Sequence, residues 1–285
     1  MSVSPPADRH PAGHRPHRAG SDVPFLVLMS VLGGSYILLI LALLAADIAY
    51  TSPRHFLVAL QKPEIRYAIQ LTLISCTISA LLSILVATPL GYLLSRFHFR
   101  GRWLLDTLID IPIVLPPLVI GLSLLILFHL PLAGSNLDQI LRDHLQVQVT
   151  FAPPAVVLAQ FAVACAFAVH AMRLTFDQID TRPEQVALTL GCRRSQAFFR
   201  VVLPQAWRGI IAASTVAWAR SLGEFGPILV FAGATRKRTE VLSTTVFLEL
   251  SVGQLEAAVA VSLLMVLAAM IVLGIVRLVG SEVGR

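Results

Sequence analysis

The sequence EQVALTLGCRRSQAFFRVVLP, residues 184–204, is a polar and basic stretch between two long apolar runs. Its first part, 184–190, has helical composition and no proline, and Gly191 can adopt the positive φ that ends a helix. A second short helical run, 194–202, leads to Leu203-Pro204. We therefore expect two short helices, joined at the glycine and bounded by the proline, that project from one membrane face. The alternative is a surface loop that only connects two spans.

The chain on either side of this stretch has the composition of an integral membrane protein. Hydrophobic residues make up 56% of the 285 residues and charged residues only 13%, which is far from a soluble average. Apolar runs of about twenty residues are long enough to cross a bilayer. They predict an all-α membrane domain over 24–281 with six transmembrane helices, at about 25–46, 69–94, 104–130, 154–172, 210–232 and 255–278.

Residues 1–23 are rich in proline, histidine, glycine and arginine, and they contain almost nothing to bury. We interpret them as a disordered cytoplasmic tail. Proline and glycine separate His10, His14 and His17, so these histidines have no preset metal-binding geometry. The apolar run that follows is too long for the core of a cleaved signal peptide, and we expect it to remain as the first span.

The basic residues predict an orientation. They gather in the second–third and fourth–fifth links, which the positive-inside rule assigns to the cytoplasm together with both termini. Because the rule accounts for the net charge of +6, nucleic acid is not needed as a partner. A shorter group, Arg236 to Arg238, runs against this orientation. The residues that support it are Arg96, Arg100, Arg102, Arg173, Arg182, Arg193, Arg194, Arg200 and Arg208.

The third predicted span contains Pro112, Pro116 and Pro117. Such a helix must bend or break, and irregular backbone at this depth is tolerated only inside a bundle or along a water-lined path. Near its start, Asp106 and Asp110 are four residues apart and share a helix face. We favour an interfacial helix start, with pairing to Arg100 or Arg102, over a proton relay.

The fifth predicted span contains Arg220 and Glu224, also four residues apart and able to pair. Ionisable groups inside a span cost about 2.5–3.5 kcal/mol each and are candidates for function. Gly223 and Gly226 allow close helix approach or a local bend. Two interpretations stay open, a structural ion pair and a polar segment that lines a path for a hydrophilic solute.

The sequence lacks a phosphate-binding GxxxxGK[ST] loop, so we expect no ATPase site in this chain. It also lacks an HExxH motif and an activated pair of carboxylates, so no catalytic residue is predicted. Cys76, Cys165 and Cys192 are scattered, without spacing for a metal or a disulfide framework. We therefore predict neither a metal nor a cofactor in this chain.

Residues 184–204 resemble the EAA loop of permease subunits of ATP-binding-cassette transporters, roughly E-x-A-A-x-x-L-G followed by eleven residues and L-P. Val186 replaces the first alanine and Val201 the usual isoleucine. The resemblance implies a type I importer domain in the bacterial inner membrane, coupled to a cytoplasmic ATPase dimer that carries ATP and Mg²⁺. It also implies a periplasmic or lipoprotein binding protein. The matching positions are Glu184, Ala187, Leu190, Gly191, Leu203 and Pro204.

Two further segments, VLPPLVIGLSLLILF at 114–128 and ARSLGEFG at 219–226, are similar to the molybdate and sulfate permeases. This narrower resemblance implies import of a tetrahedral oxyanion, molybdate first, with tungstate or sulfate as alternatives. Because six bent helices suit a half-channel, we expect a second copy to complete the path. The candidate path or gate residues are Pro116, Pro117, Arg220, Ser221, Gly223, Glu224 and Gly226.

Two other classes of membrane protein stay open. A secondary transporter would work without an ATPase, and a membrane-embedded enzyme would need converging polar groups on several spans. Only the Arg220–Glu224 pair and the Asp106/Asp110 pair offer such groups. Copurification of a nucleotide-binding subunit would argue against the secondary transporter.

Overall fold

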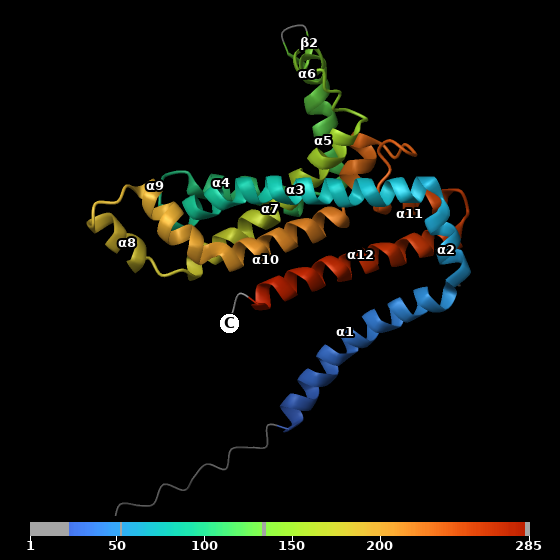
Figure 1. Ribbon diagram of the computed structural model, residues 1–285, viewed down its shortest axis with the longest axis horizontal. Coiled ribbons are helices and arrows are strands. Elements are labelled where there is room, and N and C mark those ends of the chain that lie inside the picture. The colour runs from blue at the N-terminus through green and yellow to red at the C-terminus, as the bar shows by residue number, and fades with distance from the viewer. Residues whose placement is uncertain (1–22, 52, 133–134, 283–285) are drawn as a thin grey trace, which may run out of the picture. The chain divides into compact units, whose positions relative to one another are not determined.

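The computed structural model describes residues 23–51, 53–132 and 135–282 (Figure 1). Residues 1–22 of the predicted tail, including its histidines, lie outside the described residues. The helices are α1 (Val23–Tyr50), α2 (Pro53–Gln61), α3 (Pro63–Arg96), α4 (Arg102–Val114), α5 (Pro117–His129), α6 (Leu137–Leu145), α7 (Pro153–Gln178), α8 (Arg182–Thr189), α9 (Arg194–Ala197), α10 (Leu203–Leu222), α11 (Leu242–Ser251) and α12 (Leu255–Glu282).

Four short elements complete this description. Two π-helical turns, η1 (Phe198–Val202) and η2 (Ile228–Ala232), precede and follow α10. The strands β1 (Pro131–Leu132) and β2 (Ser135–Asn136) form a small antiparallel hairpin. The predicted all-α fold class is confirmed apart from this hairpin.

The chain divides after Asp47, so α1 is described by itself. It is a 28-residue helix with an apolar sequence and no buried residue. Its length and composition are sufficient to cross a bilayer. This finding agrees with the span predicted at about 25–46.

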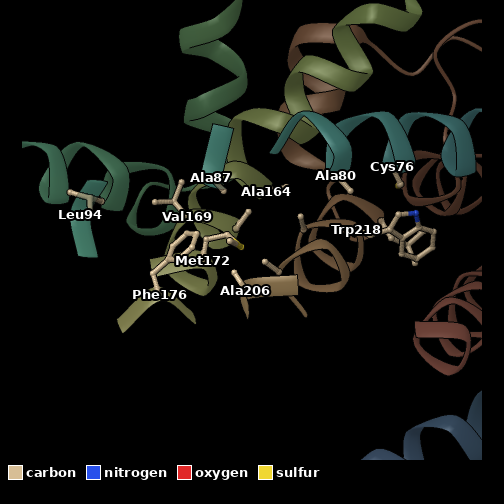
Figure 2. Packing of buried hydrophobic residues seen from close by; sticks show 14 of the residues in the cluster. Cys76, Ala80, Ala87, Leu94, Ala164, Val169, Met172, Phe176, Ala206 and Trp218 are labelled. Carbon is tan, nitrogen blue, oxygen red and sulfur yellow. The ribbon is translucent and has the colours of Figure 1, made fainter. Parts of the chain in front are cut away.

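The core of residues 48–285 lies where α3, α7 and α10 pack side by side (Figures 1 and 2). Alanines dominate this core, and small residues let helix backbones approach closely. At Gly91 on α3, an added Cβ would lie 2.8 Å from the Met172 Cβ and from the Arg173 backbone nitrogen on α7. Helices α3 and α7 therefore cross so closely at this point that only glycine fits.

Two smaller apolar clusters flank this core. One joins α5, α7 and η2, with Phe128 against Phe231 at a ring-centroid distance of 5.1 Å. The other joins α2, α3, α11 and α12 around Ile65 and Leu242. Many large apolar side chains on α3, α4, α5 and α12 remain exposed, as expected for helices that face lipid.

The third predicted span is not one helix. Helices α4 and α5 meet at Leu115-Pro116 with a bend of 111°. Pro116 and Pro117 both lack a backbone N–H, so the α-helical ladder cannot continue through them. The sequence predicted a bend or break here, and the structure contains a break.

The fifth predicted span, 210–232, is not one continuous helix in the structure. Helix α10 starts earlier, at Leu203, and ends at Leu222, and the turn η2 begins only at Ile228. Gly223 caps α10, and Gly226-Pro227 interrupts the ladder beyond it. Within the described residues, four helices are long and apolar enough to cross a membrane, or five if α4 and α5 count as one span. The prediction of six crossings is therefore not confirmed.

Candidate functional site

The first candidate region is the projection formed by α8, α9 and η1. Helix α8 ends at Gly191, whose φ is +89°. The Cys192 N–H donates to the Ala187 carbonyl at 3.0 Å and the Gly191 N–H to the Leu188 carbonyl at 3.1 Å. This pair of bonds is a Schellman motif, which needs a left-handed residue after the helix. The predicted helix end at Gly191 is confirmed.

The predicted boundary at Leu203-Pro204 is wrong. The helical backbone continues from α9 through η1 into α10, because the Leu203 N–H donates to the Phe198 carbonyl five residues earlier. A π turn has an extra residue, which relieves the clash that a proline ring makes with the carbonyl four residues before it. Pro204 therefore lies inside a bent continuous helix instead of separating two helices.

The projection has two different faces. Ala187 is buried and Glu184 is mostly buried, both toward the rest of the protein. Leu190 is 80% exposed and Val186 56% exposed, on the opposite side of α8. Phe199, on η1, is 65% exposed. The motif residues of the sequence prediction thus divide into an inward set and an apolar outward set.

Glu184 contacts the far end of α3. The Tyr92 hydroxyl donates a hydrogen bond to Glu184 Oε1, and Arg96 Nε lies 3.5 Å from Glu184 Oε2. Arg96 Nη2 also donates to the Ile179 carbonyl, at 2.8 Å, where α7 has just ended. The sequence analysis missed Tyr92. Its spacing of four residues from Arg96, on one helix face, was the available signal.

The second candidate region is the place where the two helix breaks meet. A cavity of about 290 Å³ lies between the α4–α5 break and the α10–η2 break. Leu118 and Phe225 line part of it. The other lining residues are six of the seven predicted path residues, namely Pro116, Pro117, Arg220, Gly223, Glu224 and Gly226. Residues about one hundred positions apart in the chain are therefore neighbours.

Two glycines make this meeting possible. A Cβ on Gly121 would lie 2.7 Å from the Cα of Pro227, and a Cβ on Gly226 would lie 3.0 Å from the Leu118 nitrogen. Real side chains do not tolerate the first distance. The start of α5 therefore packs directly against the backbone of 226–227.

The predicted ion pair at this cavity is present. Arg220 Nη2 lies 3.2 Å from Glu224 Oε2, and the Glu224 side chain is only 1% exposed whereas that of Arg220 is 31% exposed. The Arg220 guanidinium also stacks over Phe167, 5.4 Å from the ring centroid. The Ser243 hydroxyl donates to the Glu224 carbonyl at 2.7 Å. The pair leaves Arg220 as the accessible charge.

Ser221 lies elsewhere. Its Oγ is 3.1 Å from Ser79 Oγ on α3, and its carbonyl accepts a hydrogen bond from Gln160 Nε2 at 3.2 Å. All three side chains are buried. Ser221 therefore joins α10 to α3 and α7 and does not line the cavity.

The two aspartates of α4 find partners that the sequence did not indicate. Arg173 Nη1 binds Asp106 Oδ1 at 2.8 Å, and His170 Nε2 lies 2.7 Å from Asp110 Oδ1. The expected partner Arg102 makes only a 3.8 Å contact with Asp106. Both aspartates therefore link α4 to α7.

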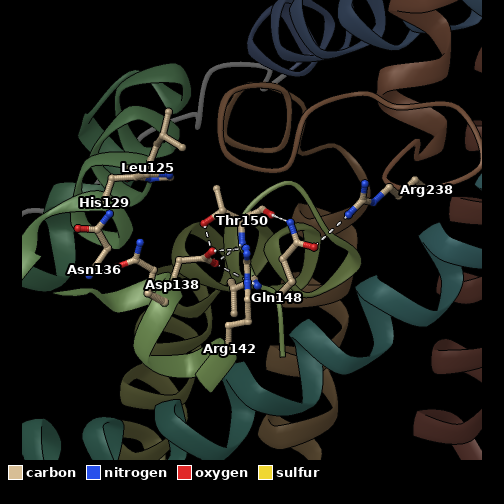
Figure 3. Close-up of polar contacts among 10 residues, drawn as sticks. Leu125, His129, Asn136, Asp138, Arg142, Gln148, Thr150 and Arg238 are labelled. Carbon is tan, nitrogen blue, oxygen red and sulfur yellow. Dashed lines mark hydrogen bonds and ion pairs between the residues drawn. The ribbon is translucent and has the colours of Figure 1, made fainter. Parts of the chain in front are cut away.

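Asp138 anchors the segment after α5 (Figure 3). Its Oδ1 accepts hydrogen bonds from the Val149 N–H, the Thr150 N–H and the Thr150 hydroxyl at 2.9–3.2 Å, and its Oδ2 pairs with Arg142 at 3.1 Å. Burial alone would raise the pKa of Asp138. The hydrogen bonds from Thr150 and Val149 and the Arg142 charge outweigh burial and hold this pKa below its usual value.

Two residues of the basic group that opposed the predicted orientation are paired with carboxylates. Arg236 Nη2 binds Glu249 Oε1 at 3.0 Å, and Lys237 Nζ binds Glu64 Oε1 at 3.0 Å. Glu240 beside them is fully buried, and neither carboxylate oxygen has a hydrogen-bond partner among the described residues. Burial raises the pKa of Glu240, and the Arg236 charge offsets this only in part.

Comparisons with known proteins find a matching family model and similar chains. Residues 87–285 match the family model described as "Binding-protein-dependent transport system inner membrane component". The molybdenum transport system permease protein ModB of Mycobacterium tuberculosis is 35% identical over 257 residues, which cover 90% of this chain and 94% of the relative.

Two further matches extend this finding. The sulfate transport system permease protein CysT of Escherichia coli is 30% identical over 249 residues, covering 87% of this chain and 88% of the relative. A solved structure, a bacterial alginate ABC transporter in complex with a periplasmic protein bound to an alginate pentasaccharide, aligns with a TM-score of 0.68. That alignment covers 94% of this chain and 98% of that chain at 20% identity, and so it shows a shared fold.

Proposed function

The chain belongs to the family of binding-protein-dependent transport system inner membrane components, and we propose that it carries a tetrahedral oxyanion, molybdate first, into the cell. It is the permease component of an ATP-binding-cassette importer, a transport component without an ATPase site of its own, and it is close to permeases for molybdate and sulfate. Tungstate and sulfate are the alternative cargoes. An ATP-independent transporter is disfavoured by this family membership.

The outward face of the projection supports coupling to an ATPase. Leu190, Val186 and Phe199 are apolar and exposed, and the exposed polar or basic residues Thr189, Arg193 and Arg194 lie among them in the chain. An exposed apolar patch with a polar rim is typical of a protein interface. We assign it to a groove of the ATPase dimer, which holds ATP and Mg²⁺.

The observation that carries the cargo assignment is the cavity at the two helix breaks. Arg220 is its accessible cation, and its partner Glu224 fixes the guanidinium from the buried side. One cation beside a polar backbone break can favour a dianion without holding it tightly. Weak binding suits translocation, because a tight site would retain the ion.

The remaining parts of the proposal concern assembly. A second copy of the chain would complete the path opposite the cavity. A periplasmic or lipoprotein binding protein would deliver the anion, as a periplasmic protein occurs in the solved alginate transporter complex. We place the complex in the inner membrane with both termini and the 184–204 loop in the cytoplasm, on the distribution of arginine.

The test is reconstitution of the permease in liposomes with its ATPase and its binding protein. We expect ATP-dependent uptake of radiolabelled molybdate that excess tungstate and sulfate reduce according to their affinity for the binding protein. If the complex takes up sulfate and excess molybdate does not reduce this uptake, the cargo is sulfate and not molybdate. Uptake that proceeds without ATP would contradict the proposal.

A second measurement tests the docking face alone. Leu190→Asp puts a charge into the apolar patch. We expect the affinity of the permease for the ATPase subunit to fall at least tenfold, since burying one leucine contributes about 1.5–3 kcal/mol. Gln185→Asp, an exposed position of the same helix, is the charge control and should bind normally. Normal binding of Leu190→Asp would refute this docking face.

A further inference from the structure

Glu184 is a charged residue of the projection that faces away from its apolar outer face. Its side chain is 12% exposed, and that of Arg96 is 11% exposed. Tyr92 and Arg96 lie one turn apart on α3 and bind the two oxygens of this one carboxylate. Hydrogen bonds and ion pairs to a charged group are the stronger polar contacts, especially where water is largely excluded.

Arg96 holds a second point of the same connection. Its Nη2 donates to the Ile179 carbonyl at 2.8 Å, five residues before Glu184. Helix α3 therefore contacts both ends of the segment that joins α7 to α8. This segment cannot shift relative to α3 without the loss of contacts to Arg96.

The ring of Tyr92 adds packing to the polar contacts. Its centroid lies 4.7 Å from that of Phe198 on η1 and 5.6 Å from that of Phe176 on α7. These are the distances of favourable aromatic pairs. One side chain of α3 therefore contacts α7, α8 and η1.

The residue before Tyr92 makes this junction rigid. Gly91 lies against α7 so closely that an added Cβ would meet the Arg173 nitrogen at 2.8 Å. Backbone contact of this kind leaves no space for α3 to slide past α7. Helices α3 and α7 are therefore closely packed beside Tyr92, the residue that contacts Glu184 on α8.

We propose that Tyr92 and Arg96 are positioning residues that fasten α8 to α3 through Glu184, so that α3 moves with the projection when the ATPase displaces it. This inference rests on the proposed function, because it needs an ATPase that moves α8. The alternative is a purely structural role, in which the three residues only stabilise the fold. The two roles predict different results for coupling.

The first experiment measures anions imported per ATP hydrolysed by the reconstituted complex. Tyr92→Phe keeps the ring and removes the hydroxyl, and Glu184→Gln keeps the shape and removes the charge. We expect about a tenfold fall in import per ATP for each variant. The loss of one hydrogen bond to a charged group changes an equilibrium constant by roughly that factor. ATPase activity and complex assembly should be retained.

The matched control is Tyr67→Phe on the same helix. The Tyr67 hydroxyl donates to the Arg238 carbonyl at 3.1 Å, at the other end of α3. This variant also loses one tyrosine hydrogen bond, but it should keep the native ratio of import to hydrolysis. Equal ratios for Tyr92→Phe, Tyr67→Phe and the native complex would refute the linkage.

The second experiment measures the distance between the end of α3 and α8 directly. In a variant without native cysteines, spin labels are placed at the exposed positions His98 and Gln185, just beyond α3 and on α8. We expect the same label distance with and without ATP, whereas a label pair at Gln185 and the exposed Asp143 should change. With Tyr92→Phe added, the His98–Gln185 distance should also change with ATP.

The outcomes separate the two proposals. If the native complex shows no ATP-dependent import, the proposed function is wrong. If the native complex imports the anion while the His98–Gln185 distance changes with ATP, only the linkage is wrong.

Discussion

The projection and the cavity both depend on glycine, but for opposite reasons. Gly191 has a φ of +89° and nothing within 4 Å of an added Cβ, so its backbone conformation demands glycine while space does not. Gly121 and Gly226 have no positive φ, and each would place a Cβ against the backbone of the opposite helix break. The projection needs a shape of its own, whereas the cavity needs two segments in close contact.

This difference predicts where substitutions act. A change at Gly191 strains an exposed turn and should leave the transmembrane packing intact. A change at the cavity glycines forces apart two segments that the fold holds together. We therefore expect function to be lost with only a small loss of stability at the projection, whereas at the cavity both function and stability should be lost.

Gly121→Ala should have the largest effect on stability. The new methyl group would meet the Pro227 Cα at 2.7 Å and its carbonyl oxygen at 3.0 Å, and backbone atoms cannot rotate away. We expect a loss of about 3 kcal/mol, the upper part of the range for overpacking. The melting temperature of the purified protein in detergent measures it. An unchanged melting temperature would show that the two breaks are not in this contact.

Gly226→Ala should have a smaller effect at the same place. Its Cβ would lie 3.0–3.2 Å from Leu118 and Pro117, so a shift of a few tenths of an ångström relieves the clash. We expect a loss of about 1–2 kcal/mol in the same melting assay. Because the shift widens the contact beside Arg220, uptake should fall more than ATP hydrolysis. A larger loss than that of Gly121→Ala would reverse the proposed order of crowding.

Gly191→Asp tests the projection. A non-glycine residue in the left-handed region costs about 1–2 kcal/mol, and aspartate is among the better tolerated residues there. We expect a small change in melting temperature, normal insertion and a severe loss of uptake with ATP hydrolysis retained. Thr189→Asp adds the same charge in α8 without a positive φ and should transport. Normal uptake by Gly191→Asp would argue against a coupling role for this turn.

Gly223→Ala should have the smallest effect. This glycine lines the cavity, yet its φ of −81° suits alanine and the nearest atoms to an added Cβ are 4.0 Å away. We expect a change within about 0.5 kcal/mol and nearly normal uptake. A large loss would mean that the backbone at Gly223 changes its conformation during transport.

Local sequence predicted the features whose causes lie within a few residues. The left-handed turn at Gly191, the break at Pro116-Pro117 and the Arg220–Glu224 pair all depend on neighbours no more than about one helical turn away. Composition and apolar run length were sufficient for the membrane class. The predicted boundary at Leu203-Pro204 failed because a π turn can accommodate proline without ending the helix.

The fifth span shows the limit of apolar run length. A run of sufficient hydropathy covers 210–232, but Gly223 and Gly226-Pro227 end α10 inside it. Irregular backbone in such a position needs partners for its polar groups, and these come from distant side chains such as Ser243 and Gln160. Nothing in the run itself indicates that these partners exist.

The sequence by itself determined the membrane class, the motif of the projection and the helix break at Pro116-Pro117, because each follows from local backbone chemistry or from composition. Only the tertiary structure decided that the two breaks share one cavity, that Asp106 and Asp110 bind Arg173 and His170, and that Glu184 faces Tyr92 and Arg96. Each of these contacts joins residues at least sixty positions apart. Such pairs are chosen by how helices pack, and helix packing depends on the small residues of the whole core at once.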